Sequence, residues 1–163
     1  PAKLWADNYL EKLEDPSNLL RVAIHAGSPI AAKRWPTKRF AELIDWLIFH
    51  HQAQVFLVGV KSELPINSEI ENRIKKKAFN IVGETNLQQL AELLRRCNLF
   101  IGNDSAPMHI SATVGTQTIG LYGASSPNRF CPIGPNCATI ARESMNQIRV
   151  LDVVSVIDSL VLT

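Results

Sequence analysis

The sequence has no long hydrophobic run, no large excess of either charge and few cysteines, and each of these absences excludes a class of protein. No apolar segment approaches the roughly 20 residues that span a bilayer. Residues 1–20 are charged throughout and lack the apolar core of a signal peptide. The net charge of +2 is too small to indicate a nucleic-acid partner by itself. We therefore expect a cytoplasmic protein with no membrane span and no nucleic-acid partner.

The cysteines are few and do not suggest a framework of disulfides or metal ligands. Cys97, Cys131 and Cys137 form an odd set in a chain of 163 residues. A domain of this size buries about 68–70% of its surface on folding and needs no covalent staple. We expect reduced thiols. No second cluster of Cys or His lies near Cys131 and Cys137 to complete a zinc site, so we expect no metal.

Several catalytic motifs are missing as well. The sequence contains neither G-x-G-x-x-G nor G-x-x-x-x-G-K-[ST], the fingerprints of dinucleotide-binding domains and P-loop proteins. It also lacks the G-x-S-x-G elbow of serine hydrolases and the H-E-x-x-H helix of zinc proteases. Hydride transfer, P-loop hydrolysis and serine hydrolysis are therefore disfavoured.

What the sequence does contain is a regular alternation of short apolar runs with amphipathic segments. The runs predict strands, and the amphipathic segments predict helices. The expected strands are 21–25, 54–58, 80–82, 99–101, 117–122 and 138–140, and the expected helices are 37–51, 67–77, 105–114, one opened by a Thr85–Gln88 capping box and one capped by Asp152. This order is typical of an α/β protein whose parallel sheet is covered by helices on both faces. Residues 1–20 form a lead-in helix, and residues 21–163 form one domain.

Basic residues gather in two places. Lys33, Arg34, Lys38 and Arg39 crowd one segment, and Arg73 and Lys75–Lys77 crowd another. We expect the second group to be a solvated helix end. The first group begins in a loop, His25–Pro36, that also contains Gly27 and Ser28, although such a loop with a nearby Lys is more often only a connection.

A second loop, Gly102–His109, follows an expected strand and opens an expected helix. Ser105 is suited to cap that helix, and Pro107 is suited to its first turn. The free N–H groups of such a helix end favour an anion such as a diphosphate. Asp104 either caps the helix or contacts a ligand. In a third loop, 121–127, Ser125 and Ser126 either contact a phosphate or sugar or simply form a turn.

These loops together resemble one enzyme family. The segments Gly102-Asn-Asp-Ser-Ala-Pro-Met-His109, Tyr122-Gly-Ala-Ser-Ser-Pro127 and His25-Ala-Gly-Ser28 with Lys33-Arg-Trp-Pro36 are similar to motifs of the ADP-heptose:lipopolysaccharide heptosyltransferases, glycosyltransferase family 9. The resemblance covers residues 21–135 and corresponds to the C-terminal, donor-binding half. It implies a Rossmann-like domain of a GT-B enzyme that transfers heptose with inversion from ADP-heptose to the lipopolysaccharide inner core.

The resemblance also implies a division of labour between two domains. An N-terminal domain, to which nothing in these residues corresponds, holds the lipopolysaccharide acceptor and the aspartate that acts as general base. We therefore expect no catalytic base in this chain, no cofactor beyond the donor substrate, and a peripheral contact with the inner membrane only in a full-length protein. Two alternatives stay open: a GT-B transferase that uses another nucleotide sugar, and a nucleotide-sugar-binding domain without catalysis.

The donor-binding residues that the resemblance implies are Gly27, Ser28, Lys33, Glu63, Asp104, Ser105, Ala106 and His109. Ser28 and Lys33 correspond to contacts with the diphosphate, and Asp104 corresponds to a contact with the heptose. Ser105 and Ala106 would offer backbone N–H groups to the phosphates, His109 would support this cluster, and Glu63 would bind the ribose. Ala106 stands where the family usually has Gly, which predicts a modest effect on donor affinity and none on the fold.

Overall fold

The computed structural model describes residues 1–13, 19–126 and 135–160, and its centre is a six-stranded sheet. The strands are β1 (Arg21–His25), β2 (Gln54–Leu57), β3 (Phe79–Asn80), β4 (Leu99–Asn103), β5 (Gln117–Tyr122) and β6 (Cys137–Ala141). They follow the order β3-β2-β1-β4-β5-β6, and every neighbouring pair is parallel. This is the strand order of the doubly wound α/β fold, so the expected Rossmann-like class is confirmed.

The central strands bury both of their faces, which explains why they read as continuous apolar runs in the sequence. In β1, Val22 and Ile24 belong to one core cluster, and Ala23 between them belongs to the other. In β4 the same alternation places Ile101 in the first cluster and Phe100 in the second. The sheet therefore separates two hydrophobic cores, and each core needs its own layer of helices.

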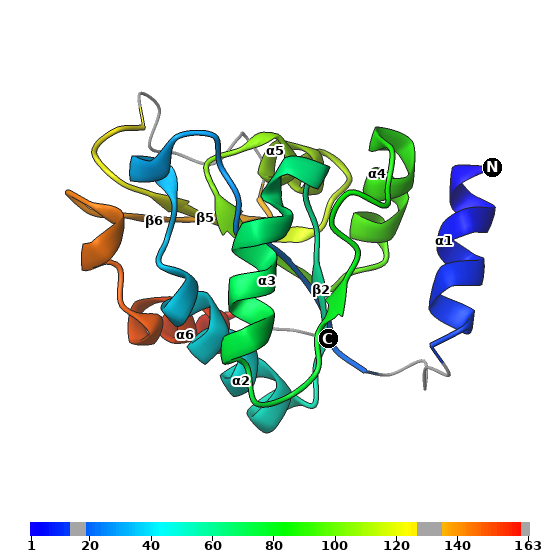
Figure 1. Cartoon of the computed structure of the whole chain (residues 1–163), viewed down its shortest axis with the longest axis horizontal. Coiled ribbons are helices and arrows are strands. Elements are labelled where there is room, and N and C mark those ends of the chain that lie inside the picture. The colour runs from blue at the N-terminus through cyan, green and yellow to red at the C-terminus, as the bar shows by residue number, and fades with distance from the viewer. Residues whose placement is uncertain (14–18, 127–134, 161–163) are drawn as a thin grey trace.

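Six α-helices supply these layers in the described part of the chain (Figure 1). Apolar residues of α2 (Thr37–His51), α3 (Leu64–Arg73) and α6 (Val150–Ser159) enter the first core cluster. Those of α1 (Ala2–Glu11), α4 (Leu87–Arg95) and α5 (Ala106–Thr113) enter the second. Helices therefore cover both faces of the sheet, as the sequence predicted.

The first helix, α1, packs against α4 at one side of the molecule (Figure 1). The guanidinium of Arg96 joins the two helices, because it contacts the carboxylate of Asp7 at 2.8 Å and that of Glu92 at 2.6 Å. On the inner side, Trp5 stacks on Tyr9, and Tyr9 meets the ring of Phe56 at 6.3 Å. The lead-in helix expected within residues 1–20 is thus present and docked on the second core.

Several local expectations differ from the structure. The strand expected at 80–82 spans Phe79–Asn80. The helix expected at 67–77 spans Leu64–Arg73, because Pro65 fits its first turn. The capping box lies one residue further on than expected, at Asn86 and Gln89, whose side chains and backbone N–H groups bond reciprocally at 2.8 and 3.0 Å. Asp152 lies in the first turn of α6, where its carboxylate accepts the backbone N–H of Arg149.

The described residues include two of the three cysteines. Cys97 is a free thiol, and Cys131 lies outside the described residues. Burial raises the pKa of the Cys97 thiol to about 12, so it is a packing residue and not a nucleophile. Among the helices that the structure describes, none is long and apolar enough to cross a membrane.

Candidate functional site

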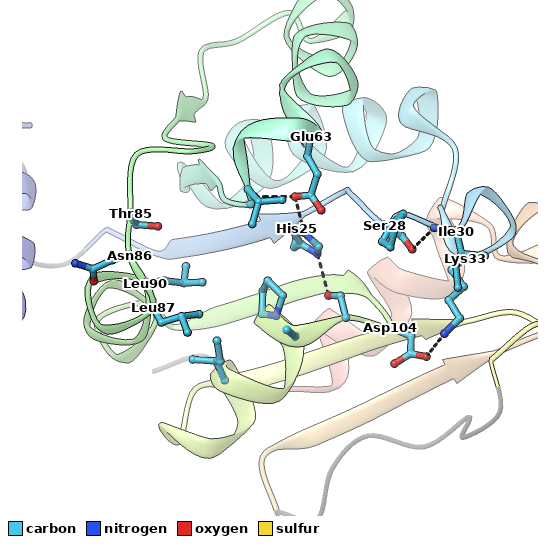
Figure 2. A pocket seen from close by; sticks show the side chains of 17 residues that line it. His25, Ser28, Ile30, Lys33, Glu63, Thr85, Asn86, Leu87, Leu90 and Asp104 are labelled. Carbon is cyan, nitrogen blue, oxygen red and sulfur yellow. Dashed lines mark hydrogen bonds and ion pairs between the residues drawn. The ribbon is translucent and has the colours of Figure 1, made fainter.

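A cavity of about 560 Å³ opens at the carboxyl edge of the sheet. It opens where β1 and β4 lie side by side and their connections depart in opposite directions, which is the point where doubly wound sheets bind ligands. Its walls come from the loops after β1, β2 and β4 and from the starts of α4 and α5. Figure 2 shows Leu87 and Leu90, next to Thr85 and Asn86, at one end of this cavity and Lys33 with Asp104 at the other.

A buried histidine links two of these loops. His25, the last residue of β1, has both ring nitrogens at hydrogen-bond distance from side chains on other segments. Its Nε2 lies 2.9 Å from Oε2 of Glu63, and its Nδ1 lies 2.9 Å from Oγ of Ser105. The Ser105 hydroxyl is also 2.9 Å from the carbonyl oxygen of Asn103. His25 therefore connects the loop of Glu63, 38 residues away in the sequence, to the loop of Ser105, 80 residues away.

Two glycines make the room in which the Glu63 carboxylate lies. A Cβ atom placed on Gly27 would come within 2.2 Å of Cδ of Glu63, and one placed on Gly59 within 2.1 Å of Oε2. Gly59 also has φ +153°, a conformation that side-chain-bearing residues rarely adopt. Gly27 and Gly59 therefore permit a close approach of backbone and carboxylate that no other residue would allow.

The surroundings of Glu63 favour its ionised form. Burial by itself raises the pKa of this carboxyl, but the hydrogen bond and charge of His25 oppose that rise. The backbone N–H of Val60, which donates to Oε2 at 3.0 Å, and the charge of Arg34 act in the same direction. The net effect is a pKa below the ordinary value, so Glu63 presents a carboxylate acceptor at neutral pH.

A second pair of charges lies across the pocket. The ammonium of Lys33 contacts Oδ2 of Asp104 at 3.2 Å, and both side chains are only about one-sixth exposed, at 16% and 17%. Lys33 comes from the loop after β1 and Asp104 from the loop after β4, and Figure 2 shows them meeting. An ammonium and a carboxylate thus lie together in the wall of the pocket.

Hydrogen bonds of Trp35 and Arg34 fix the loop that carries Lys33. Trp35 is buried, and its indole N–H donates to the carbonyl of Ile148 at 2.9 Å. Its backbone N–H donates to Oδ1 of Asn103 at 3.1 Å, while the amide of Asn103 donates to the carbonyl of Ala26 at 3.0 Å. Above it, Nε of Arg34 donates to the carbonyl of Ser28 at 2.7 Å. These hydrogen bonds to the rest of the protein fix the conformation of the loop before any ligand binds.

The N-terminal turn of α5 lines the same pocket. Ser105 occupies the cap position but its side chain makes no cap bond, since its hydroxyl is engaged with His25 and Asn103. Ala106 is the first residue of the helix and is exposed to the pocket, and Pro107 follows it in the first turn. The unused N–H donors and the positive end of the helix dipole suit an anion.

The remaining wall is apolar, and reasoning from the sequence missed it. Leu87 and Leu90 from α4 and Ile110 from α5 line the cavity opposite the charged pairs. Leu87 is 71% exposed, although it begins an amphipathic helix whose other leucines are buried. A leucine directly after the N-cap of a helix is the sequence feature that could have indicated this apolar wall. This side of the pocket therefore offers an apolar surface to a ligand.

The structure brings most of the predicted site residues together. Six of them line the pocket, namely Ser28, Lys33, Glu63, Asp104, Ser105 and Ala106. Gly27 lies directly behind Glu63. His109 does not join them: its side chain is exposed and is not part of the pocket wall, because it lies on the outer side of α5. Ser126 is buried and also lies outside the pocket wall.

Two further features of the site follow from the described residues. His25 was quoted in the sequence motif without a role, and the structure makes it the centre of the polar network. Within residues 1–13, 19–126 and 135–160, no group of three or more His, Cys, Asp or Glu side chains is arranged to hold a metal ion. The polar lining of the pocket includes one ammonium, two carboxylates, hydroxyls, the His25 imidazole and the Asn86 amide.

Comparison with known proteins gives a consistent picture. The model of a family described as glycosyltransferase family 9 (heptosyltransferase) matches residues 6–154. The chain is 36% identical over 115 residues to lipooligosaccharide heptosyltransferase 2 of Haemophilus influenzae, covering 68% of this chain and 33% of that protein. It is 34% identical over 113 residues to lipopolysaccharide heptosyltransferase 2 of Salmonella typhimurium, covering 67% of this chain and 32% of that protein.

A solved structure agrees over almost the whole chain. ADP-heptose lps heptosyltransferase II of E. coli superposes with a TM-score of 0.84 and 26% identity, covering 97% of this chain and 50% of that one. The chain therefore spans about a third of the length of the curated relatives it matches and half of this solved chain.

Proposed function

The chain belongs to glycosyltransferase family 9, and from this premise we propose that its pocket binds the nucleotide-sugar donor of a heptosyltransferase. The proposed donor is ADP-heptose, and the proposed acceptor is the lipopolysaccharide inner core. The name of the E. coli relative includes ADP-heptose, and those of the curated relatives include lipopolysaccharide or lipooligosaccharide. The observation that carries the proposal is the pocket itself, where a lysine, an aspartate and a helix N-terminus converge at the switch point of the sheet.

Each part of such a donor has a chemically suitable neighbour in the pocket. The base would lie on Leu87 and Leu90, and the ribose hydroxyls would donate to the carboxylate of Glu63. The diphosphate would lie over the N-terminus of α5, within reach of Lys33. Asp104, released from Lys33, would accept hydrogen bonds from the hydroxyls of the sugar. The polar and apolar sides of the cavity thus correspond to the two ends of one molecule.

The same groups would assist transfer. Breaking the anomeric C–O bond with inversion leaves negative charge on the ADP leaving group. A fixed cation and preorganised N–H donors stabilise charge that develops during a reaction, which is commonly the largest catalytic contribution of a protein. Here Lys33 and the first turn of α5 would perform that role. The proposal includes no metal ion, and a chelator such as EDTA should therefore leave donor binding unchanged.

The general base and the acceptor site are proposed to belong to an N-terminal domain that these 163 residues do not include. Loss of a general base costs about 10²–10⁴ in rate. Loss of the surface that positions the acceptor costs up to about 7–11 kcal/mol of activation free energy. The chain by itself should therefore bind the donor and transfer no detectable sugar.

The test is a calorimetric titration of the chain with ADP-heptose, a UDP-sugar and a GDP-sugar, beside a transfer assay with truncated lipopolysaccharide. Saturable binding of ADP-heptose alone, without transfer, is the expected result. Preference for a UDP- or GDP-sugar would instead identify another donor. Binding of none of the three would contradict the proposal, and clear transfer would show that the base lies within this chain.

A further inference from the structure

The wall of the pocket combines one ammonium with two carboxylates, an unusual balance for a site that suits an anion. In the part of the chain that the structure describes, these groups belong to Lys33, Glu63 and Asp104. Lys33 and Asp104 are 3.2 Å apart and largely buried, and Figure 2 shows them as a pair at the end of the pocket away from Leu87. An anionic ligand therefore meets a cation whose charge a neighbouring carboxylate already balances.

Neither member of this pair has a second polar partner within residues 1–13, 19–126 and 135–160. The ammonium of Lys33 donates to Oδ2 of Asp104, and Oδ1 of Asp104 accepts no hydrogen bond from the described residues. A ligand that draws Lys33 to its phosphates therefore leaves Asp104 without a counter-ion. An uncompensated charge in a largely buried position is costly unless new hydrogen-bond donors reach it.

Asp104 is less able than Lys33 to move away from such a ligand. Lysine has its charge on a flexible four-carbon stem, whereas the short side chain of aspartate stays near its backbone. Hydrogen bonds hold both chain neighbours of Asp104, because Asn103 bonds to the loop after β1 and Ser105 bonds to His25. As the pair stands, a phosphate oxygen in contact with the Lys33 ammonium lies within about 6 Å of Oδ2 of Asp104.

Two kinds of nucleoside diphosphate differ in what they bring to this carboxylate. In a nucleotide sugar the terminal phosphate is an ester with a single negative charge, and the sugar beyond it has hydroxyl groups that can donate to a carboxylate. In a free nucleoside diphosphate the terminal phosphate has up to two negative charges near neutral pH and no hydroxyl beyond it. Like charges placed side by side disfavour a complex, so the two ligands should bind differently.

We propose that Asp104 is a specificity-determining residue that selects diphosphates esterified by a polyhydroxylated group and disfavours free nucleoside diphosphates. This inference rests on the proposed function, because it needs a diphosphate beside Lys33. The ligand must satisfy both members of the pair: its phosphates replace Asp104 at the ammonium, and its hydroxyls replace Lys33 at the carboxylate.

The same residue would then help the product to leave. In transfer, the anomeric C–O bond breaks and its electron pair stays on the terminal phosphate of ADP. The acceptor oxygen bonds to the anomeric carbon, and its proton goes to the general base proposed for the N-terminal domain. The sugar takes its hydroxyls away from Asp104, and the terminal phosphate gains a negative charge. Asp104 thus favours the donor over the ADP that remains after transfer.

Calorimetric titration with three adenine ligands at about pH 8, where the terminal phosphate of ADP is fully ionised, tests the proposal. The ligands are ADP-heptose, the β-methyl ester of ADP, and ADP. The methyl ester has the charge of the donor but no sugar hydroxyls, so it separates the effect of charge from that of hydrogen bonds. The expected order of affinity is ADP-heptose, then the methyl ester, then ADP, with each step about tenfold or more.

Three variants connect this order to the carboxylate. Asp104→Asn keeps the size of the side chain and an acceptor for Lys33 but removes the charge, so the gap between ADP and the methyl ester should close. Lys33→Ala leaves the carboxylate without its cation, so all three ligands should bind more weakly and the gap should widen. Glu42→Gln, the matched control, removes an equal charge from an exposed position on α2 and should leave the gap unchanged.

The outcomes distinguish this inference from the function on which it rests. ADP that binds as tightly as its methyl ester, or a gap that Asp104→Asn leaves open, overturns the role of Asp104 and leaves the donor site standing. A gap that Glu42→Gln closes equally would assign the effect to the overall charge and also overturns that role. Absence of binding by all three ligands overturns both proposals. Circular dichroism identifies a variant that has failed to fold, and the order of affinities in the unmodified chain remains decisive if Asp104→Asn does not fold.

Discussion

Residues 33–39 and residues 73–77 contain four basic side chains each, but the structure uses the two groups differently. In the first, Lys33 pairs with Asp104 inside the pocket and Arg34 holds the carbonyl of Ser28. In the second, Arg73 pairs with Glu69 in solvent, both about half exposed, and Lys77 lies 5.7 Å from the ring of Phe79. Both groups contain the same number of basic side chains, so charge alone does not explain their different contacts.

What differs is the place of each group in the topology. The first follows β1 at the carboxyl edge of the sheet, where parallel strands converge on a crevice. The second follows α3 and leads into β3 at the opposite edge, where backbone N–H groups of Lys75 and Lys76 bond to Asp45. A basic run in a sequence is therefore informative about ligands only once its position relative to the strand ends is known.

The largest expected effect concerns the anchoring of the first basic segment. Trp35→Ala removes a fully buried ring that packs edge-on against Phe40 at 4.8 Å and donates to Ile148. We expect a loss of about 3–5 kcal/mol in the free energy of unfolding, as for other buried aromatic truncations. Denaturant unfolding measures it. The matched control is Phe49→Ala, since Phe49 is 75% exposed and its loss should change stability by less than about 0.5 kcal/mol.

The next effect separates the two groups by function. Lys33→Ala should weaken ADP-heptose binding by about 1.5–3 kcal/mol, the contribution of one charge-assisted contact. Lys76→Ala removes an equal charge from the second segment and should leave binding unchanged. Calorimetric titration of both variants measures the difference. Equal losses in the two variants would mean that only the overall charge of the protein attracts the donor.

Within the first segment, neighbouring cations should differ as well. Arg34 supports the loop through the carbonyl of Ser28 and does not line the pocket. Arg34→Ala should therefore weaken ADP-heptose binding by only about 0.5–1.5 kcal/mol, because it loosens the loop but removes no contact with the donor. A loss as large as that of Lys33→Ala in the same titration would move the phosphate contact from Lys33 to Arg34.

The smallest effect is a pH dependence. The folded-state pKa of Glu63 lies below its ordinary value, so Glu63 stabilises the fold above that ordinary value and loses this contribution as the pH falls through the folded-state pKa. Arg34→Ala removes one of the charges that lower it, so the pKa should rise and the loss should begin at a higher pH. Carboxyl NMR titration measures it, and Lys76→Ala should leave the Glu63 curve unshifted.

Much of the fold could be predicted from the sequence because the pattern of burial is local. The double-sided burial of β1 and β4 produces apolar runs, and helix 37–51 shows its apolar stripe directly; its predicted bounds match α2. The end of α3 could not be predicted, because it depends on a distant group: Asp45 accepts the N–H groups of Lys75 and Lys76 and draws the chain out of the helix.

In the candidate site, too, some features could be predicted from the sequence and others could not. Lys33 and Asp104 could be placed together because both follow neighbouring strands, and the carboxyl ends of parallel strands share one edge. The role of His25 could not be inferred, because its partners lie 38 and 80 residues away and only the folded chain brings them to it. His109 was expected near the cluster, but the turn of α5 directs it outward.

The buried position of Trp35 also gives the protein an optical reporter of its own pocket. Its indole is bonded to Ile148 and its backbone to Asn103, two contacts within the scaffold of the Lys33 loop. Trp46, by contrast, lies on α2 between the rings of His50 and His51. Emission from Trp35 should be blue and should respond to donor, whereas emission from Trp46, which is remote from the pocket wall, should not. With Trp46 and Trp5 replaced by Phe, the fluorescence of Trp35 alone would follow occupancy of the site without any added label.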